Sequence, residues 1–281
     1  MNPLKEFLTS RRARIEPGDV GLPPSTTPRR SKGLRREEVA ILAGVSVDYY
    51  TRLEQGRVGN VSDQVLVAVE NALRLDPLER DHFRTLITPA PARPRRDPAP
   101  RAGARPALRR MVDVLDPVPA LLQGPRMEIL AINGAAKALL ADFGAMPVAD
   151  RNIARWVFLD PRAKVVFPEW DMIAADIVAA LRRNLNPRRA DEALNRVVGE
   201  LTCASPEFSR LWADYKLFQH GHGRKKFFNE LVGTLTLNYE TFHPPGGEGQ
   251  ALSIYTADAG SPDQDKLDLL VNWAGVQAGR A

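Results

Sequence analysis

The sequence has little cysteine and no long apolar run. Cys203 is the only cysteine among 281 residues, so an internal disulfide and a zinc site built from cysteines are excluded. No segment approaches the roughly 18 apolar residues that a membrane-spanning helix requires. The N-terminus also lacks the basic, apolar and small-residue order of a signal peptide, because Pro3, Lys5 and Glu6 come too early. We therefore expect a cytoplasmic protein that has no membrane segment.

Motifs of common enzyme classes are missing as well. The sequence contains neither a G-x-G-x-x-G loop nor a Walker pattern. His220 and His222 stand two positions apart without a further ligand, which is typical of a solvent-exposed loop, with a metal site as the second interpretation. Cys203 has no histidine–acid pair nearby and is interpreted as a small structural residue, and Ser205 and Ser261 are explained as helix caps. We expect no catalysis, no cofactor and no bound metal.

Positive charge is present, and it is unevenly distributed. Residues 1–110 contain 21 Lys+Arg and 13 Asp+Glu, a net charge of +8, whereas residues 111–281 contain 18 and 21, a net charge of −3. The two values add to the +5 of the whole chain. A basic N-terminal third on a mildly acidic body indicates one domain that binds a polyanion and one that does not.

The first 88 residues are predicted to form a small all-α domain of five helices. Ser62 is a suitable N-cap, and Asp76-Pro77-Leu78-Glu79 combines an N-cap, a proline at the first helical position and a returning carboxylate. The expected helices are 2–15, two within 34–57, 62–73 and 76–88. A linker rich in proline and arginine follows at 89–106. Its arginines either contact DNA phosphates or are simply solvated.

Residues 107–281 are predicted to form an α+β domain with an antiparallel sheet. Strands are expected at 127–133, 231–242 and 252–256, and in the second of these Leu235 and Tyr239 face the same side. Helices are expected between the first strand and the last two, and after Ser261. Antiparallel strands with inserted helices are typical of the α+β class.

The segment LRREEVAILAGVSVDYYTRLEQGR, residues 34–57, is the most informative part of the chain. It predicts two short helices joined by a tight turn at Gly44, with the small Ala40 where the helices cross. Ser46 caps the second helix, so its N-terminal end can face a phosphate. This pattern predicts a helix-turn-helix, and a plain helical hairpin with a solvated charged face is the alternative.

The second motif helix exposes side chains suited to DNA. Arg52 can donate to a guanine edge, Asp48 can accept from cytosine and Val47 can contact a thymine methyl group. Thr51 is the fourth exposed position on this helix. The predicted phosphate contacts are Arg36, at the start of the first motif helix, and Gln55 and Arg57, beyond the second.

These residues resemble the Cro/phage-repressor (XRE-like) helix-turn-helix family. The resemblance covers about residues 3–75 and is carried by LRREEVA, AGVS and YYTRLEQGR. It implies that Arg36 and Ser46 contact the DNA backbone, and that Val47, Asp48 and Arg52 contact bases. It also implies a transcription regulator whose partner is double-stranded DNA.

The C-terminal domain is rich in aromatic side chains, which either form its core or line a cavity. A sheet partly wrapped by helices can enclose a ligand that a few polar groups orient. The candidate ligand-binding residues are Asn133, Arg155, Trp156, Trp170, Trp212 and Tyr239.

Six ordered segments in residues 110–272 resemble the MmyB-like ligand-binding domain. The resemblance implies a PAS-like fold, an antiparallel sheet with flanking helices, that senses a small, fatty-acid-like ligand. The segments are PALLQGPRMEILAIN, ADFGAMPVADRNIARWVFLDPRAK, FPEWDMIAADIVAALRRN, GELTCASPEFSRLWADY, LVGTLTLNYETF and GQALSIYTADAGSPDQDKLDLL.

The whole sequence therefore predicts a ligand-responsive transcription regulator. We expect a homodimer, because one helix-turn-helix buries too little surface for operator selectivity. The alternatives are a DNA-binding regulator whose C-terminal domain only dimerises or binds a protein partner, and an enzyme with a DNA-binding appendage. The latter requires converging titratable groups that the sequence does not offer.

Overall fold

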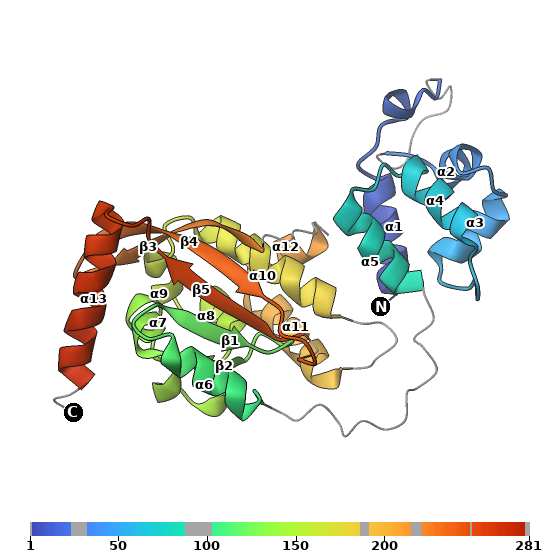
Figure 1. Cartoon of the computed structure of the whole chain (residues 1–281). Coiled ribbons are helices and arrows are strands. Elements are labelled where there is room, and N and C mark those ends of the chain that lie inside the picture. The colour runs from blue at the N-terminus through green and yellow to red at the C-terminus, as the bar shows by residue number, and fades with distance from the viewer. Residues whose placement is uncertain are drawn as a thin grey trace. The chain divides into compact units, whose positions relative to one another are not determined.

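The chain forms two compact units, one of helices and one built on a sheet (Figure 1). The computed structural model describes residues 2–23, 33–87, 103–185, 191–214, 221–247 and 249–278. Most of the predicted linker and His220 lie outside these residues.

The N-terminal unit is all α, as predicted. Five α-helices are described in it, together with a short 3-10 helix at Pro17–Val20. The first helix ends at Arg12 rather than at 15, because Pro17 restricts the preceding Glu16 to an extended conformation (φ −79°, ψ 145°). The helices are α1 Pro3–Arg12, α2 Arg36–Leu42, α3 Val47–Glu54, α4 Asp63–Ala72 and α5 Pro77–Ile87.

Side-chain caps fix where these helices begin. The Ser62 hydroxyl accepts a hydrogen bond from the backbone N–H of Val65 at 3.4 Å. Asp76 and Glu79 bond reciprocally: the Glu79 N–H donates to Asp76 Oδ1 at 2.8 Å and the Asp76 N–H donates to Glu79 Oε2 at 3.2 Å. Such caps satisfy backbone donors that have no acceptor inside the helix.

The C-terminal unit contains a five-stranded antiparallel sheet in the order β2-β1-β5-β4-β3. The predicted strands 127–133, 231–242 and 252–256 correspond to β2, β4 and β5. Two strands were not predicted, and one of them begins at His222, where the sequence had indicated a loop. The strands are β1 Ala120–Gln123, β2 Ile129–Ile132, β3 His222–Asn229, β4 Gly233–Phe242 and β5 Ala251–Thr256.

Helices cover both faces of this sheet (Figure 1). Leu108 and Val112 of the first helix pack against Leu122 and Leu252 on one face, and the larger core lies on the other. That first helix begins at Pro106, where the predicted linker ends. The helices are α6 Pro106–Val114, α7 Gly134–Leu139, α8 Ile153–Leu159, α9 Arg162–Val166, α10 Trp170–Asn184, α11 Glu192–Ala204, α12 Pro206–Ala213 and α13 Pro262–Ala278.

The alternation of residues along β4 decides which side chains enter the larger core. Leu235, Leu237 and Tyr239 are buried, as the sequence pattern predicted. Across the strand pairs, Tyr239 lies opposite Tyr255, so both aromatic rings are on the same face. The inner face of the sheet and helix α10 therefore form the two walls of the cavity in this unit. Among the described helices, none combines the length and apolarity that crossing a bilayer requires.

Candidate functional sites

Helices α2 and α3 are joined by a tight turn. Gly44 adopts a left-handed conformation (φ +64°), which glycine reaches without the steric cost of a side chain. The Val45 N–H donates to the Ala40 carbonyl at 3.0 Å, and Ala40 is buried where the helices meet. Tyr50 and Leu53 anchor α3 in the core. This arrangement is the helix-turn-helix that the sequence predicted.

One face of α3 is exposed and polar. Val47, Asp48 and Arg52 are exposed and Thr51 is half-buried. The Arg52 Nε lies 3.4 Å from Asp48 Oδ2, and both side chains are more than half exposed. An ion pair this exposed contributes about 0–1 kcal/mol, so DNA can replace it at little cost. These residues are therefore available to base edges.

The start of α3 suits a phosphate. The Ser46 hydroxyl accepts from the Tyr49 N–H at 3.1 Å, which confirms its role as N-cap. The N–H groups of the first turn have no acceptor within the helix, and they carry partial positive charge. An anion bound there is stabilised by both effects.

A buried carboxylate holds the motif helices on the rest of the unit. Glu54 is fully buried, and it accepts from Arg12 Nε at 3.1 Å and from Arg36 Nη2 at 2.8 Å. The hydrogen bond and charge of Glu54 raise the pKa of Arg36. Because the three residues belong to α1, α2 and α3, this network fixes the angle at which α3 is presented.

The network gives Arg36 a structural role that sequence reasoning missed. Its side chain is still 42% exposed, so a phosphate contact stays a prediction. The other two predicted phosphate contacts follow α3 directly. Arg57 is exposed, and Gln55 is half-buried, with its backbone carbonyl accepting from Asn2 Nδ2 at 2.7 Å.

We expect Arg36→Ala to lower both stability and the salt dependence of DNA binding. Loss of its hydrogen bonds to Glu54 lowers the free energy of unfolding by about 1–2 kcal/mol. Loss of one phosphate contact lowers the slope of log K against log salt by about 0.9. Denaturation and binding titrations at several salt concentrations measure the two effects. Arg57→Ala is the control, since it changes the slope alone. A slope unchanged in Arg36→Ala contradicts the phosphate contact.

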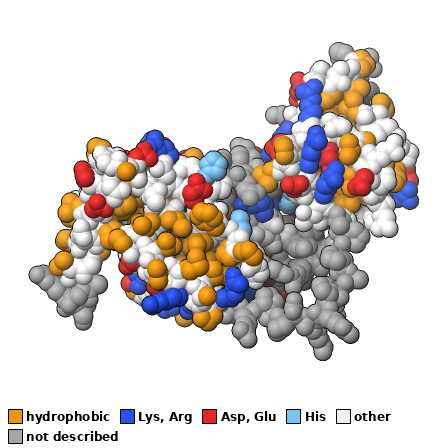
Figure 2. Space-filling view, viewed as in Figure 1, with side chains coloured by type: hydrophobic (Ala, Val, Ile, Leu, Met, Phe, Trp, Pro, Cys, Tyr) orange, Lys and Arg blue, Asp and Glu red, His pale blue; other side chains and the backbone are white. Residues whose placement is uncertain are grey.

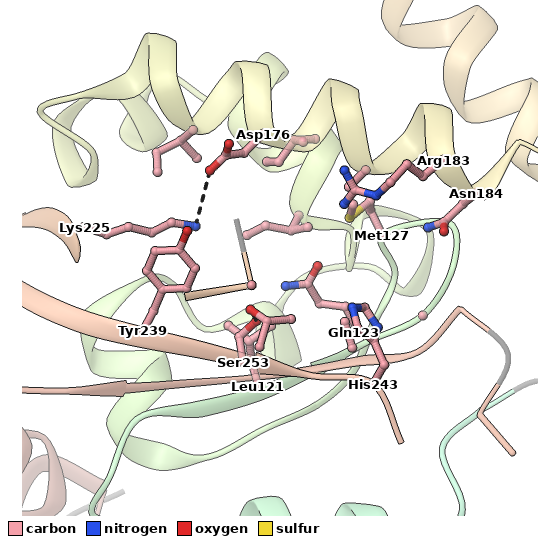
Figure 3. Close-up of a pocket in the computed structure, with 18 of the residues that line it drawn as sticks. Leu121, Gln123, Met127, Asp176, Arg183, Asn184, Lys225, Tyr239, His243 and Ser253 are labelled. Carbon is pink, nitrogen blue, oxygen red and sulfur yellow. Dashed lines mark hydrogen bonds and ion pairs between the residues drawn. The ribbon is translucent and has the colours of Figure 1, made fainter. Parts of the chain in front are cut away.

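In the C-terminal unit, a cavity of about 200 Å³ lies between α10 and the inner face of the sheet (Figure 3). Its apolar wall includes Leu121, Met127, Phe167, Ile173, Ile177 and Ala180. Its polar wall includes Asp176 and Arg183 from α10 and Lys225, Tyr239, Ser253 and His243 from the sheet side. The cavity is therefore a mixed site with apolar and charged surfaces.

Three groups meet at one end of the cavity. The Lys225 Nζ lies 3.8 Å from Asp176 Oδ2 and 4.1 Å from the centre of the Tyr239 ring. Gly223 makes room for that ring, because a Cβ at this position would lie 3.2 Å from Tyr239 Cε1 and its φ of +151° disfavours a side chain. Burial lowers the pKa of Lys225 and raises that of Tyr239 to about 12.

Arg183 and His243 stand toward the other end of the cavity (Figure 3). Burial lowers the pKa of Arg183, and the charge of Asp176 partly opposes this. The His243 Nδ1 is 3.1 Å from the Gln250 carbonyl oxygen. Since a carbonyl oxygen can only accept, the His243 Nδ1 donates this hydrogen bond.

Of the six predicted ligand-binding residues, Tyr239 lines this cavity and the other five do not. Asn133 has a structural role: its Oδ1 accepts from the Ala120 N–H at 3.1 Å and its Nδ2 donates to the Val118 carbonyl at 2.7 Å. Arg155 forms an ion pair with Glu200.

The three tryptophans are packed into the protein rather than against the cavity. Trp156 meets Phe167 edge to face, with ring centres 5.7 Å apart. The Trp170 indole N–H donates to the Val157 carbonyl at 2.9 Å. Trp212 stacks on Phe208, and the Arg182 guanidinium lies over the Trp212 ring, 4.5 Å from its centre. These three aromatic side chains therefore contribute to the packing of the unit and do not line the cavity.

Two further sequence interpretations can be placed. Cys203, which the sequence indicated to be a small structural residue, is an exposed free thiol. Within the described ranges, which include His222 but not His220, no group of three His, Cys, Asp or Glu side chains is gathered to hold a metal.

Two protein-family models match this chain, one in each unit. Residues 26–83 match the model of a helix-turn-helix domain. Residues 104–270, more than half of the chain, match the MmyB-like transcription regulator ligand binding domain. The chain therefore belongs to the MmyB-like transcription regulators, and it is a DNA-binding regulator with a ligand-sensing domain. Among curated proteins, no match was found.

Proposed function

We propose that this regulator binds specific DNA as a homodimer and changes its DNA affinity when a small, fatty-acid-like ligand enters the cavity between α10 and the sheet. The observation that carries the proposal is the presence of an exposed helix-turn-helix and a mixed apolar and cationic cavity in one chain. No catalytic step is part of the proposal, and its place of action is the cytoplasm.

Sequence reading is assigned to three residues of α3. Val47, Asp48 and Arg52 are the exposed side chains with the chemistry to contact thymine, cytosine and guanine respectively. Phosphate contacts from Ser46 and its neighbours orient the helix but carry no sequence information.

A dimer follows from the small size of one recognition helix. Two-fold dimers of this motif read half-sites about one helical turn, 34–36 Å, apart. Ligand binding regulates such a dimer only if the ligand has different affinity for two arrangements of the DNA-binding domains.

A thermal shift of the full chain with a panel of fatty acids tests ligand sensing. All four tryptophans lie in the C-terminal unit, so their fluorescence reports its unfolding. A ligand at about 100 times its Kd stabilises the folded state by roughly 2.7 kcal/mol. We expect at least one panel member to raise the transition temperature, and stabilisation by none of them counts against sensing.

Exposed apolar side chains favour a second candidate, a C-terminal domain that serves only dimerisation. On α13, Leu269, Trp273 and Val276 are each more than half exposed at helical spacing. Figure 2 shows hydrophobic side chains gathered on the C-terminal unit. Light scattering decides on the dimer, and the thermal shift decides on the ligand. A dimer that no ligand stabilises supports this second candidate.

A further inference from the structure

The charged groups of the cavity lie at two ends and not at one. Figure 3 shows Asp176, Lys225 and Tyr239 together at one side, and Arg183 and His243 at the other. Asp176 and Arg183 are seven residues apart on α10, which places their backbones about 10 Å apart along the helix axis. Tyr239 of β4 lies at the Asp176 end, and His243, just after β4, lies at the Arg183 end (Figure 3).

The wall between these two ends is apolar along α10, whereas on the sheet side Gln123 and Ser253 add polar groups beside Leu121 (Figure 3). On α10, Ile177 and Ala180 face the cavity between the two charged positions. Leu121 and Met127 contribute from the opposite side. A ligand that fills the cavity therefore needs an apolar middle and a polar group at each end.

The charge of the wall selects the sign of the ligand. Among the described lining residues, Lys225 and Arg183 are cationic and Asp176 is anionic, so their charges add to +1. Asp176 lies nearest to Lys225, with their side chains 20% and 16% exposed. Arg183 lies at the end away from this pair, and its guanidinium can donate two hydrogen bonds to a carboxylate (Figure 3).

An apolar tail fits the opposite end poorly. It would displace water from Lys225, Asp176 and the Tyr239 hydroxyl without replacing the hydrogen bonds of those groups. A hydroxyl or keto oxygen at this end restores them. The spacing of the two ends, about 10 Å along α10, sets the distance between the two polar groups of the ligand.

We propose that the cavity takes a compact acid with two polar ends, whose carboxylate lies at Arg183 and whose distal hydroxyl or keto group lies at Lys225, Asp176 and Tyr239. This inference rests on the proposed sensing function, and it narrows the ligand class. A long unsubstituted acyl chain satisfies the polar groups at only one of the two ends.

Isothermal titration of the full chain with four probes tests the inference. The probes are 8-hydroxyoctanoate, octanoate, 1,8-octanediol and palmitate. A site that hydrogen-bonds a ligand hydroxyl discriminates strongly against the analogue without it. We expect 8-hydroxyoctanoate to bind at least about tenfold more tightly than octanoate, which lacks the distal hydroxyl, or the diol, which lacks the carboxylate. Palmitate should bind most weakly.

Variants assign the two ends. Arg183→Met should abolish the preference for 8-hydroxyoctanoate over the diol and leave the preference over octanoate. The double variant Lys225→Met, Asp176→Asn should do the reverse, and it leaves no unpaired charge at that end. Lys226→Met is the matched control, because Lys226 is the next residue, is exposed and pairs with Glu169 at 2.7 Å.

The possible failures separate this inference from the proposed function. If octanoate or palmitate binds as tightly as 8-hydroxyoctanoate, the two-ended ligand is overturned and fatty-acid sensing stands. If the double variant keeps the full preference over octanoate, the assignment of the distal end is overturned. If none of the acids binds, both the inference and the proposed function are overturned.

Discussion

Glu54→Gln is expected to lower the free energy of unfolding of the DNA-binding unit by about 3–5 kcal/mol, because it removes the anion from a buried ion pair. Glu54 is fully buried, and the side chain of its partner Arg12 is only 11% exposed. The neutral amide cannot offset the charge of the Arg12 guanidinium, which stays in the interior. The angle of α3 is lost with the network, so DNA binding should fall as well.

The two units can be followed separately in this experiment. Far-UV circular dichroism reports both units, whereas tryptophan fluorescence reports only the C-terminal unit. Glu54→Gln should shift an early transition in the dichroism and leave the fluorescence transition unchanged. Glu37→Gln is the control, since Glu37 is exposed on α2. If the two variants unfold alike, the buried network does not stabilise this unit.

Arg52→Ala is expected to weaken binding to a specific DNA site by about 1–3 kcal/mol and to relax the preference at one base position. The Arg52 side chain is 56% exposed and its one exposed ion pair, with Asp48, contributes little to folding, so stability should hardly change. Selection of bound fragments from random DNA supplies the site and its half-site spacing.

The binding of Arg52→Ala to all four bases at each position then locates the contact. Arg57→Ala is the matched control, because an arginine that contacts phosphate weakens specific and random DNA alike. Equal losses of Arg52→Ala on specific and random DNA would show that Arg52 reads no base.

The helix-turn-helix could be predicted from the sequence because local residues determine it. Gly44 sets the turn, Ser46 caps the helix, and Ala40 permits the crossing. The Glu54 network could not be predicted, since its residues lie up to 42 positions apart and pair only in the folded unit. The one signal in the sequence was the position of Glu54, four residues after the apolar anchor Tyr50 and therefore on the same face of the helix.

In the C-terminal unit, the sheet was easier to predict than the cavity. The alternation in β4 is clear, whereas in β3 the inward-facing positions are Gly223, Lys225 and Phe227, which hide the period of two. The sequence around His222 was therefore interpreted as a loop. The tryptophans were chosen as ligand contacts for their size, but size also favours the core.

The affinity of the intact chain for its selected DNA, measured with and without the ligand that most stabilises the C-terminal unit, tests the central claim most directly. Coupling between two sites in one protein is typically 1–3 kcal/mol, so a saturating ligand should change the DNA Kd by roughly 5–150-fold. By linkage, specific DNA should change the ligand Kd by the same factor. A ligand that saturates the cavity and leaves the DNA Kd unchanged would contradict ligand-responsive regulation.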